Sequence, residues 1–299
     1  MTAVTQPIFT IKQKGSFYVC SFVAMNCPCE LMIETDDYAV AKSLSKKSVE
    51  EALRIEKKFS RYREDNIVAE INASTGLKIA VDEETSHLIH FADMAWQQSE
   101  GLFDISSGVL RKVWNFKEKK FPAKKEIEDL KKYVGWEKVT WKPPFVTVPK
   151  QMQIDFGGIG KEYATDKIAQ LFQLENIPTL VNLGGDIVCT APPKSQKSWS
   201  IGLDDPLHTG EKCIKTLSMQ QGAMATSGDA RNYLLHEGKR YGHIINPKTA
   251  YPVENAPRSV TVCADTCIEA GLFSTLAILH GEAAQAFLEE LELPFWLVP

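Results

Sequence analysis

The sequence predicts an α+β fold with mixed or antiparallel sheets and packed helices, and three observations support it. Helix-rich and strand-rich stretches alternate irregularly along the 299 residues instead of repeating as strand–helix units. Hydrophobic residues make up 44% and charged residues 24%, as in an ordinary globular protein with a sizeable core. No internal repeat or long linker divides the chain. We therefore expect one two-lobed domain over residues 16–299, preceded by an N-terminal extension of residues 1–15.

Apolar periodicity and capping residues predict the elements of the first half. Residues 16–35 are typical of two strands, and Asp36 or Asp37 can cap a long helix that ends near Phe59. A second helix starts at the acidic VDEET segment and stops at Gly101. The segments ISSGVLRKVWNF and PAKKEIEDLKKYVG predict two more helices, and WEKVTW with FVTV predicts a hairpin.

The second half is predicted to be richer in strands. A helix that follows two glycines is succeeded by strands near residues 180–183 and 187–190, and then by short strands with turns to about residue 262. The chain closes with a buried helix at IEAGLFSTLAILHG, a short polar helix and a strand at FWLV.

Charge and hydropathy exclude several functions. The net charge of −4 leaves no basic excess for nucleic-acid phosphates. No apolar run approaches the roughly 20 residues that a membrane-spanning helix needs. The first residues lack a basic segment followed by a continuous apolar one, which is the pattern of a secretory signal. These features favour a cytoplasmic location.

Cysteines and histidines offer two weaker metal candidates. The seven cysteines show no repeated compact spacing, which argues against a disulfide framework in a chain this long. Cys27 and Cys29 form a C-P-C motif that suits a soft metal, but we interpret it as two neighbouring thiols at the start of a strand. His87 and His90 lie three residues apart on a predicted helix, with no third ligand near them in the sequence.

The segment IDFGGIGKEYATD carries the strongest functional signal. It is predicted as a short strand, MQI, that ends at Asp155, followed by a Gly-Gly turn and a helix that opens with Lys161. The glycines let the backbone approach a diphosphate, and the free N–H groups at a helix start favour negative charge. This geometry suits a nucleotide, although Gly-Gly before a helix also occurs in a simple tight connection.

Four further segments place glycine and polar residues where a packed core does not require them. They are FSRYREDNIVAEIN, GLFDISSGVLRKVWNF, VNLGGDI, and MATSGDARNY followed by HIINPKTAYPV. In this order and wording, together with IDFGGIGKEYATD, they resemble the ApbE family, the FAD:protein FMN transferases. The resemblance runs from about Met25 to the C-terminus.

This resemblance implies a fold and a reaction. The fold is an ApbE-like, T-fold-like domain with an FAD cleft between two lobes. The reaction breaks the pyrophosphate of FAD, moves FMN to a Thr or Ser of a partner flavoprotein and releases AMP. Such chemistry needs neutralised phosphate charge and an activated hydroxyl, and family members use a divalent cation, usually Mg²⁺.

The resemblance also implies functional residues. The flavin and nucleotide contacts are carried over to Met25, Tyr62, Leu102, Phe103, Asp104, Asp155, Lys161 and Ile244. His243 is similar to the histidine considered as the general base toward the acceptor hydroxyl, and an imidazole that titrates near about 6.5 suits that task. The alternative is a histidine that is hydrogen-bonded for structure only.

The metal site departs from the family pattern. The implied metal positions are Gly158, Ser274 and Thr275. Gly271 stands where family members commonly have a metal-ligating Asp, so the expected carboxylate is missing. Glu162 stands where many members have glycine, and we hypothesise that Glu162 or Glu269 replaces the lost charge, because Mg²⁺ prefers at least one carboxylate.

Three alternatives remain open at this point. The chain can be an FAD carrier without transferase activity, which the missing Asp favours. It can be a metal-dependent FAD pyrophosphatase, in which water replaces the protein acceptor. It can also be a redox protein that uses Cys27 and Cys29. The sequence does not name the acceptor protein.

Overall fold

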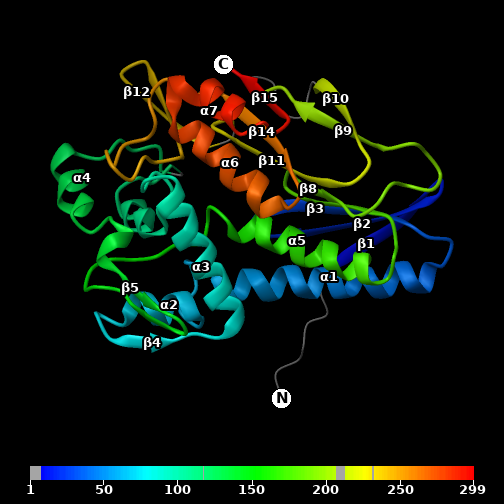
Figure 1. The fold of residues 1–299 in the computed structure, drawn as a ribbon, viewed down its shortest axis with the longest axis horizontal. Helices are drawn as coiled ribbons and strands as arrows, with labels where there is room; N and C mark the ends of the chain where they lie inside the picture. Colours follow the sequence, from blue (N-terminus) through cyan, green and yellow to red (C-terminus); the bar gives the residue numbers. More distant parts are fainter. Residues whose placement is uncertain (1–7, 117, 207–212, 231) are drawn as a thin grey trace. The chain divides into compact units, whose positions relative to one another are not determined.

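The computed structural model describes residues 8–116, 118–206, 213–230 and 232–299, and it confirms the α+β class (Figure 1). The described residues form two compact units. Unit 1 contains the residues up to 57 together with 159–226 and 261–271, and unit 2 contains 58–158, 227–260 and 272–299. The largest sheet has eight strands in the order β1-β2-β3-β7-β8-β11-β14-β15, with bounds β1 Phe9–Lys14, β2 Phe17–Ala24, β3 Cys27–Glu34, β7 Thr179–Leu183, β8 Asp186–Cys189, β11 Gly222–Gly228, β14 Ser259–Ala264 and β15 Phe295–Val298.

Unit 1 contains two tight hairpins, each closed by a two-residue turn. Strands β2 and β3 pair with Ala24 opposite Cys27, so Met25 and Asn26 alone make the turn. Both turn residues have positive φ, 52° and 58°, which is the conformation of a type I′ hairpin turn. Strands β7 and β8 are joined in the same way by Gly184 and Gly185, with φ of 65° and 104°.

Three helices belong wholly or partly to unit 1. They are α1 (Tyr38–Phe59), α5 (Gly160–Leu174) and the first turn of α6 (Cys267–Leu279). As predicted, Asp37 caps α1, since its Oδ1 accepts the Ala39 N–H at 2.7 Å. Asp166 on α5 accepts the N–H groups of Cys267 and Ile268 at 2.8 and 2.9 Å, and it thereby caps α6. The small β9 (Trp199–Asp204) and β10 (Cys213–Met219) pair separately.

Unit 2 packs short elements around an aromatic core. Its elements are α2 (Ile67–Ala73), β4 (Lys78–Ala80), α3 (Glu83–Gln98), η1 (Ile105–Lys112), α4 (Lys124–Lys131), η2 (Trp136–Lys138), β5 (Thr140–Lys142), β6 (Phe145–Thr147), β12 (Tyr233–His236), β13 (Lys239–Gly242), η3 (Gly281–Ala283), α7 (Ala284–Glu290), β15 and the rest of α6. Trp114 is buried at the centre, and its indole N–H donates to the Ala250 carbonyl at 2.9 Å.

The structure corrects three details of the sequence prediction. Residues 152–154 are not a strand, because the N–H and carbonyl of Ile154 both bond to the side chain of Asn72, at 2.7 and 3.0 Å. The predicted helix after Asp104 is the 3₁₀ helix η1. Residues 9–14 of the expected N-terminal extension form β1, which pairs with β2, while residues 1–7 lie outside the described part of the chain.

None of the helices that the structure describes is both long enough and apolar enough to cross a lipid bilayer.

Candidate functional site

A buried ion pair lies at the start of α5 in unit 1. Lys161 is in the first turn of the helix, and its Nζ lies 2.7 Å from Oδ2 of Asp186, which begins β8 and is 2% exposed. Burial alone would lower the pKa of Lys161, but the Asp186 carboxylate outweighs it, so that pKa lies above its ordinary value. Lys161 is therefore a permanent cation held in place by a buried carboxylate.

Glu162, the next residue on α5, fills the space that the missing side chain at position 271 leaves. A Cβ added to Gly271 would lie 2.5 Å from Cγ, 3.1 Å from Cδ and 3.2 Å from Oε1 of Glu162. A side chain at 271 and the present Glu162 conformation therefore exclude each other. The Oε2 atom of Glu162 is buried and has no hydrogen-bond partner in the described structure.

Several carboxylates crowd this part of unit 1. Burial, reinforced by the nearby Asp186 carboxylate, raises the pKa of Glu162 to about 8. Burial raises the pKa of Asp166 to about 6, against the two N–H groups that it accepts. The pKa of Asp186 is likewise raised by burial, against the attraction of Lys161. This region would be stabilised by an additional positive charge.

Met25 occupies a strained position at the tip of the β2–β3 hairpin. A positive φ is unfavourable for a residue with a long side chain, because Cβ approaches the carbonyl oxygen. The turn is secured by the Met25 N–H, which donates to Oε2 of Glu56 at 2.9 Å. Both positive φ values are those that the two-residue type I′ turn requires, so the hairpin itself accounts for the conformation of Met25.

Asp155 is held by an arginine in unit 2. Its Oδ2 accepts from Nη1 of Arg61 at 2.9 Å, and its Oδ1 accepts the Gly157 N–H at 2.9 Å. The same Nη1 donates to the Gly108 carbonyl at 2.6 Å. A Cβ at Gly108 would lie 2.5 Å from the Cβ of Asp155, so only glycine lets η1 pack this closely. The Asp155 carboxylate is thus fixed in direction.

The GLFD loop adopts a well-packed conformation in unit 2. The ring of Phe103 lies 3.4 Å from where a Cβ of Gly158 would be, so it packs on that backbone. Asp104 is 8% exposed, and its two oxygens accept the N–H groups of Ser106 and Trp136 at 2.7 and 2.9 Å. Asp104 therefore serves as the N-cap of η1, and its carboxylate is already occupied. Leu102 is half-buried beside them.

The side chains of Ser274 and Thr275, which are expected at the metal site, both contact the hydroxyl of Ser227. Ser227, from the ATSGD segment, lies 2.9 Å from the hydroxyl of Ser274 and 3.0 Å from that of Thr275 on α6. The following Asp229 is paired with Arg240 at 2.6 Å and with Arg258 at 3.0 Å. The first four residues of ATSGD lie in β11, and its Ser227 contacts both predicted hydroxyls.

The remaining predicted residues, Tyr62, His243 and Ile244, lie in unit 2. His243 directly follows β13, and it is half-buried together with Ile244. Tyr62 is 80% exposed, and the guanidinium of Arg61 lies 5.9 Å from its ring centre. An exposed aromatic ring beside a fixed cation is suited to stack on a flat ligand.

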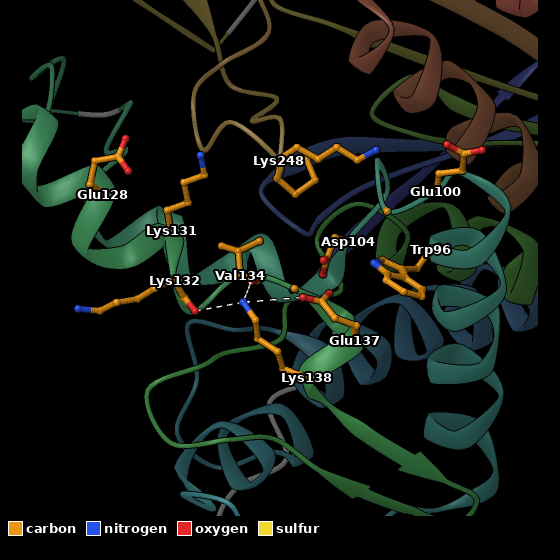
Figure 2. Close-up of a pocket in the computed structure, with 13 residues that line it drawn as sticks. Trp96, Glu100, Asp104, Glu128, Lys131, Lys132, Val134, Glu137, Lys138 and Lys248 are labelled. Carbon is orange, nitrogen blue, oxygen red and sulfur yellow. Dashed lines mark hydrogen bonds and ion pairs between the residues drawn. The ribbon is translucent and has the colours of Figure 1, made fainter.

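A cavity of about 530 Å³ also lies within unit 2 (Figure 2). Its lining includes Trp96, Asp104 of the GLFD loop and Lys248, which follows the HIINP segment. Four lysines and four carboxylates line it, so its charge is balanced. The ammonium of Lys138 is already bonded to the carbonyls of Lys132 and Val134. The cavity joins two of the sequence motifs, and one of its carboxylates, Asp104, is occupied in accepting the N–H groups of Ser106 and Trp136.

The residues present fit a divalent cation that is bound through few protein ligands. The described residues contain no cluster of three His, Cys, Asp or Glu side chains that would enclose a metal. Glu162 nevertheless offers a buried carboxylate oxygen without a partner. Mg²⁺ typically uses one or two carboxylates plus substrate phosphates and water, and does not require a cage made only of protein.

Sequence reasoning missed three residues that organise the site. Arg61 lies in the FSRY motif, next to the predicted Tyr62. Asp186 is the Asp of the VNLGGDI motif. Ser227 lies in ATSGD. In each case the residue type gave a signal, but the partner is far away in the sequence: Asp155, Lys161 and Thr275 respectively.

The chain belongs to the ApbE family, whose model matches residues 25–296. It is 29% identical to the FAD:protein FMN transferase of Haemophilus influenzae over 255 residues, which cover 81% of this chain and 74% of the relative. The crystal structure of the ApbE protein from Thermotoga maritima superposes with a TM-score of 0.86 at 29% identity, over 94% of both chains. A mutant of the flavin transferase ApbE from Vibrio cholerae gives a TM-score of 0.83 at 25% identity, over 93% and 92% of the two chains.

The buried Glu162 carboxylate makes a testable prediction about stability. An acid whose pKa is raised in the folded state stabilises the fold fully below its unfolded pKa of 4.5, and this contribution is lost as the pH rises through about 8. Glu162→Gln mimics the protonated form at every pH. In urea titrations without added metal, we expect the variant to exceed wild type by about 1–3 kcal/mol at pH 8.5. The two should converge near pH 5, and a constant difference would contradict the assignment.

Proposed function

We propose that this protein is an FAD:protein FMN transferase that attaches FMN to a Thr or Ser of a partner flavoprotein. The observation that carries the proposal is the buried Lys161–Asp186 pair at the first turn of α5, in a chain that belongs to the ApbE family. Relatives that bear the name FAD:protein FMN transferase support it. An ammonium fixed at a helix start, where free N–H groups also point outward, suits the pyrophosphate of FAD.

Two groups of residues are proposed to bind FAD. In unit 1, Lys161 neutralises phosphate charge and Met25 packs on the flavin. In unit 2, Tyr62 stacks on an aromatic ring of the ligand, and Asp155, held by Arg61, accepts a ribose hydroxyl or ring N–H. The residues Leu102, Phe103, Asp104 and Ile244 contribute loop contacts. Because the side chain of Asp104 is occupied in capping η1, its contribution is to hold the loop rigid.

His243 is proposed to act on the acceptor hydroxyl. Its imidazole removes the proton as the hydroxyl oxygen attacks the phosphorus of the FMN half. The bond to the phosphate of the AMP half breaks, and AMP leaves with the electron pair. Removing a general base of this kind typically lowers the rate by about 10²–10⁴-fold. Lys161, positioned by Asp186, stabilises the negative charge that builds up on the phosphates.

A divalent cation, when bound, would supply further charge stabilisation at the pyrophosphate. In unit 1, the proposed protein ligand is the buried oxygen of Glu162, which takes over the role of a carboxylate at position 271. Gly158 and Thr275, both in unit 2, stay predictions from the resemblance, and the Thr275 hydroxyl lies 3.0 Å from that of Ser227. Ser274 is buried, and its hydroxyl lies 2.9 Å from that of Ser227.

A product assay tests the proposal against its alternatives. The purified protein is incubated with FAD and an acceptor domain that carries a flavinylation-type Thr, with and without Mg²⁺. We expect a fluorescent band on the acceptor in a denaturing gel, dependent on Mg²⁺, and a stoichiometric amount of AMP. His243→Asn should reduce the band at least about 10²-fold while FAD binding remains.

The alternatives give different results in the same assay. Free FMN with AMP and no labelled acceptor indicates an FAD pyrophosphatase. Tight FAD binding without any product indicates a carrier, which the glycine at position 271 would then explain. An acceptor with the Thr replaced by Val serves as the matched control, and labelling of that control would refute transfer to the hydroxyl.

The relocated carboxylate can be tested by moving it back. Glu162→Gly should weaken Mn²⁺ binding, followed by electron paramagnetic resonance in the presence of FAD, by about ten-fold or more. The double change Glu162→Gly with Gly271→Asp returns a carboxylate to the vacated space and should restore binding to within about three-fold. Glu269→Gln tests the other candidate and serves as the control, because its Oε2 is engaged with the Thr266 hydroxyl at 2.7 Å.

Two outcomes would overturn the role of Glu162. In the first, Glu162→Gly binds Mn²⁺ as tightly as wild type. In the second, Glu269→Gln shows the larger loss. Neither depends on the acceptor protein, so they separate the metal assignment from the transferase assignment.

A further inference from the structure

The start of β3 carries two thiols that the proposed reaction does not use. Cys27 and Cys29 are two residues apart on a strand, so their side chains point to the same face. Their sulfur atoms lie 3.9 Å apart, and all seven cysteines are free thiols. Two Cα atoms at this spacing are roughly 6.6 Å apart in a strand, which is within the range that a disulfide spans.

The surroundings give Cys27 room at the hairpin end. A Cβ on Gly184, in the β7–β8 turn, would lie 2.7 Å from Sγ of Cys27, so the absence of a side chain there creates the space for the sulfur. The same Cβ would lie 3.8 Å from Nζ of Lys161, so the thiol and the ammonium flank one glycine. Cys27 is half-buried, whereas Cys29 is only 3% exposed.

The two thiols differ in acidity. The hydrogen bond from Cys29 lowers the pKa of Cys27 to about 7, assisted by Lys161 and opposed by burial and by the carboxylates of Asp186 and Glu56. The bond to Cys27 and burial raise the pKa of Cys29. At neutral pH this asymmetry makes Cys27 the nucleophile and Cys29 the second, resolving thiol.

The other cysteines do not share these properties. Burial raises the pKa of Cys20, Cys189, Cys263 and Cys267. Cys213 is exposed on β10, and its sulfur contacts the Lys215 carbonyl at 3.0 Å. It therefore provides an accessible comparison thiol within the same protein.

We propose that Cys27 and Cys29 form a peroxide-reactive dithiol whose oxidation closes a disulfide at the end of the β2–β3 hairpin. The Cys27 thiolate attacks hydrogen peroxide: an S–O bond forms, the O–O bond breaks, and hydroxide leaves and is protonated to water. The Cys29 sulfur then attacks the sulfur of Cys27, so that an S–S bond forms, the S–O bond breaks and a second water leaves. Two thiols and one peroxide thus give one disulfide and two waters.

Oxidation is expected to weaken FAD binding, a consequence that rests on the proposed function. Met25 is two residues from Cys27 in a two-residue turn with no slack, so a new bond at Cys27 moves it. The disulfide would therefore displace the unit 1 residue that is proposed to pack on the flavin.

Peptide mapping of the full-length protein tests the dithiol. Reduced protein is treated with a few equivalents of hydrogen peroxide at pH 7, alkylated and analysed by mass spectrometry. We expect the peptide that contains both residues to lose 2 hydrogen masses, about 2 Da, and to be restored by dithiothreitol. In Cys29→Ser, oxidation should stop at the Cys27 sulfenic acid, which dimedone traps. Cys213→Ser should leave the disulfide yield unchanged.

The proposal is overturned if Cys213 oxidises first while the peptide with Cys27 and Cys29 keeps both thiols. Because the mapping uses wild type, it stands even if a cysteine variant fails to fold. FAD titration of the reduced and oxidised samples then tests the coupling: we expect affinity to fall several-fold on oxidation and to recover on reduction. Reduced protein that does not bind FAD would refute the proposed function but not the dithiol, while equal affinities would refute only the coupling.

Discussion

The arrangement of unit 1 depends on the buried ion pair between Lys161 and Asp186. A carboxylate that is 2% exposed is costly unless a cation pairs with it, and Lys161 supplies that cation from the first turn of α5. The pair ties α5 to the start of β8, just after the Gly184–Gly185 turn. That turn leaves space for the Cys27 side chain. Cys27 begins β3, which is joined to β2 by the hairpin turn that contains Met25. One electrostatic contact thus orders a strand end, a helix start and two turns.

A second constraint is that the Glu162 side chain fills the space that a side chain at position 271 would need. A residue with a side chain at 271 cannot coexist with the present Glu162, because its Cβ would overlap the Glu162 side chain. Considered alone, the glycine suggested a lost carboxylate and therefore a protein that only carries flavin. Considered together, the Glu162 side chain occupies the space next to Gly271, and we propose that its carboxylate serves a divalent cation in place of an Asp at position 271.

Much of the fold could be predicted from the sequence, because local signals determine it. Asp37 and the apolar stripe defined α1, acids and Gly101 bounded α3, and the Gly-Gly pair preceded α5. The strand predicted before Asp155 was wrong, because the Asn72 side chain, more than 80 residues away in the sequence, takes the hydrogen bonds that a neighbouring strand would have taken. A side chain that replaces a neighbouring strand in this way does not alter the apolar periodicity of the sequence.

The candidate site was predicted in its residue types but not in its pairings. The motif order and the resemblance selected Asp155, Lys161 and Thr275, and the structure adds the partners that hold them: Arg61, Asp186 and Ser227. These partners lie between 25 and 94 residues away, so no local pattern identifies them. Two ion pairs and one contact between hydroxyls, all between residues far apart in the sequence, hold these predicted polar groups in place.

The most direct test of this account is the FAD dissociation constant of the double variant Lys161→Met with Asp186→Asn, measured by flavin fluorescence. Removing both charges together avoids leaving a buried carboxylate unpaired, so the fold should persist and its melting temperature should show it. The account predicts FAD binding at least about ten-fold weaker than wild type, equivalent to about 1.4 kcal/mol or more. An unchanged dissociation constant in a folded variant would contradict the claim that this ion pair presents the cation for the pyrophosphate.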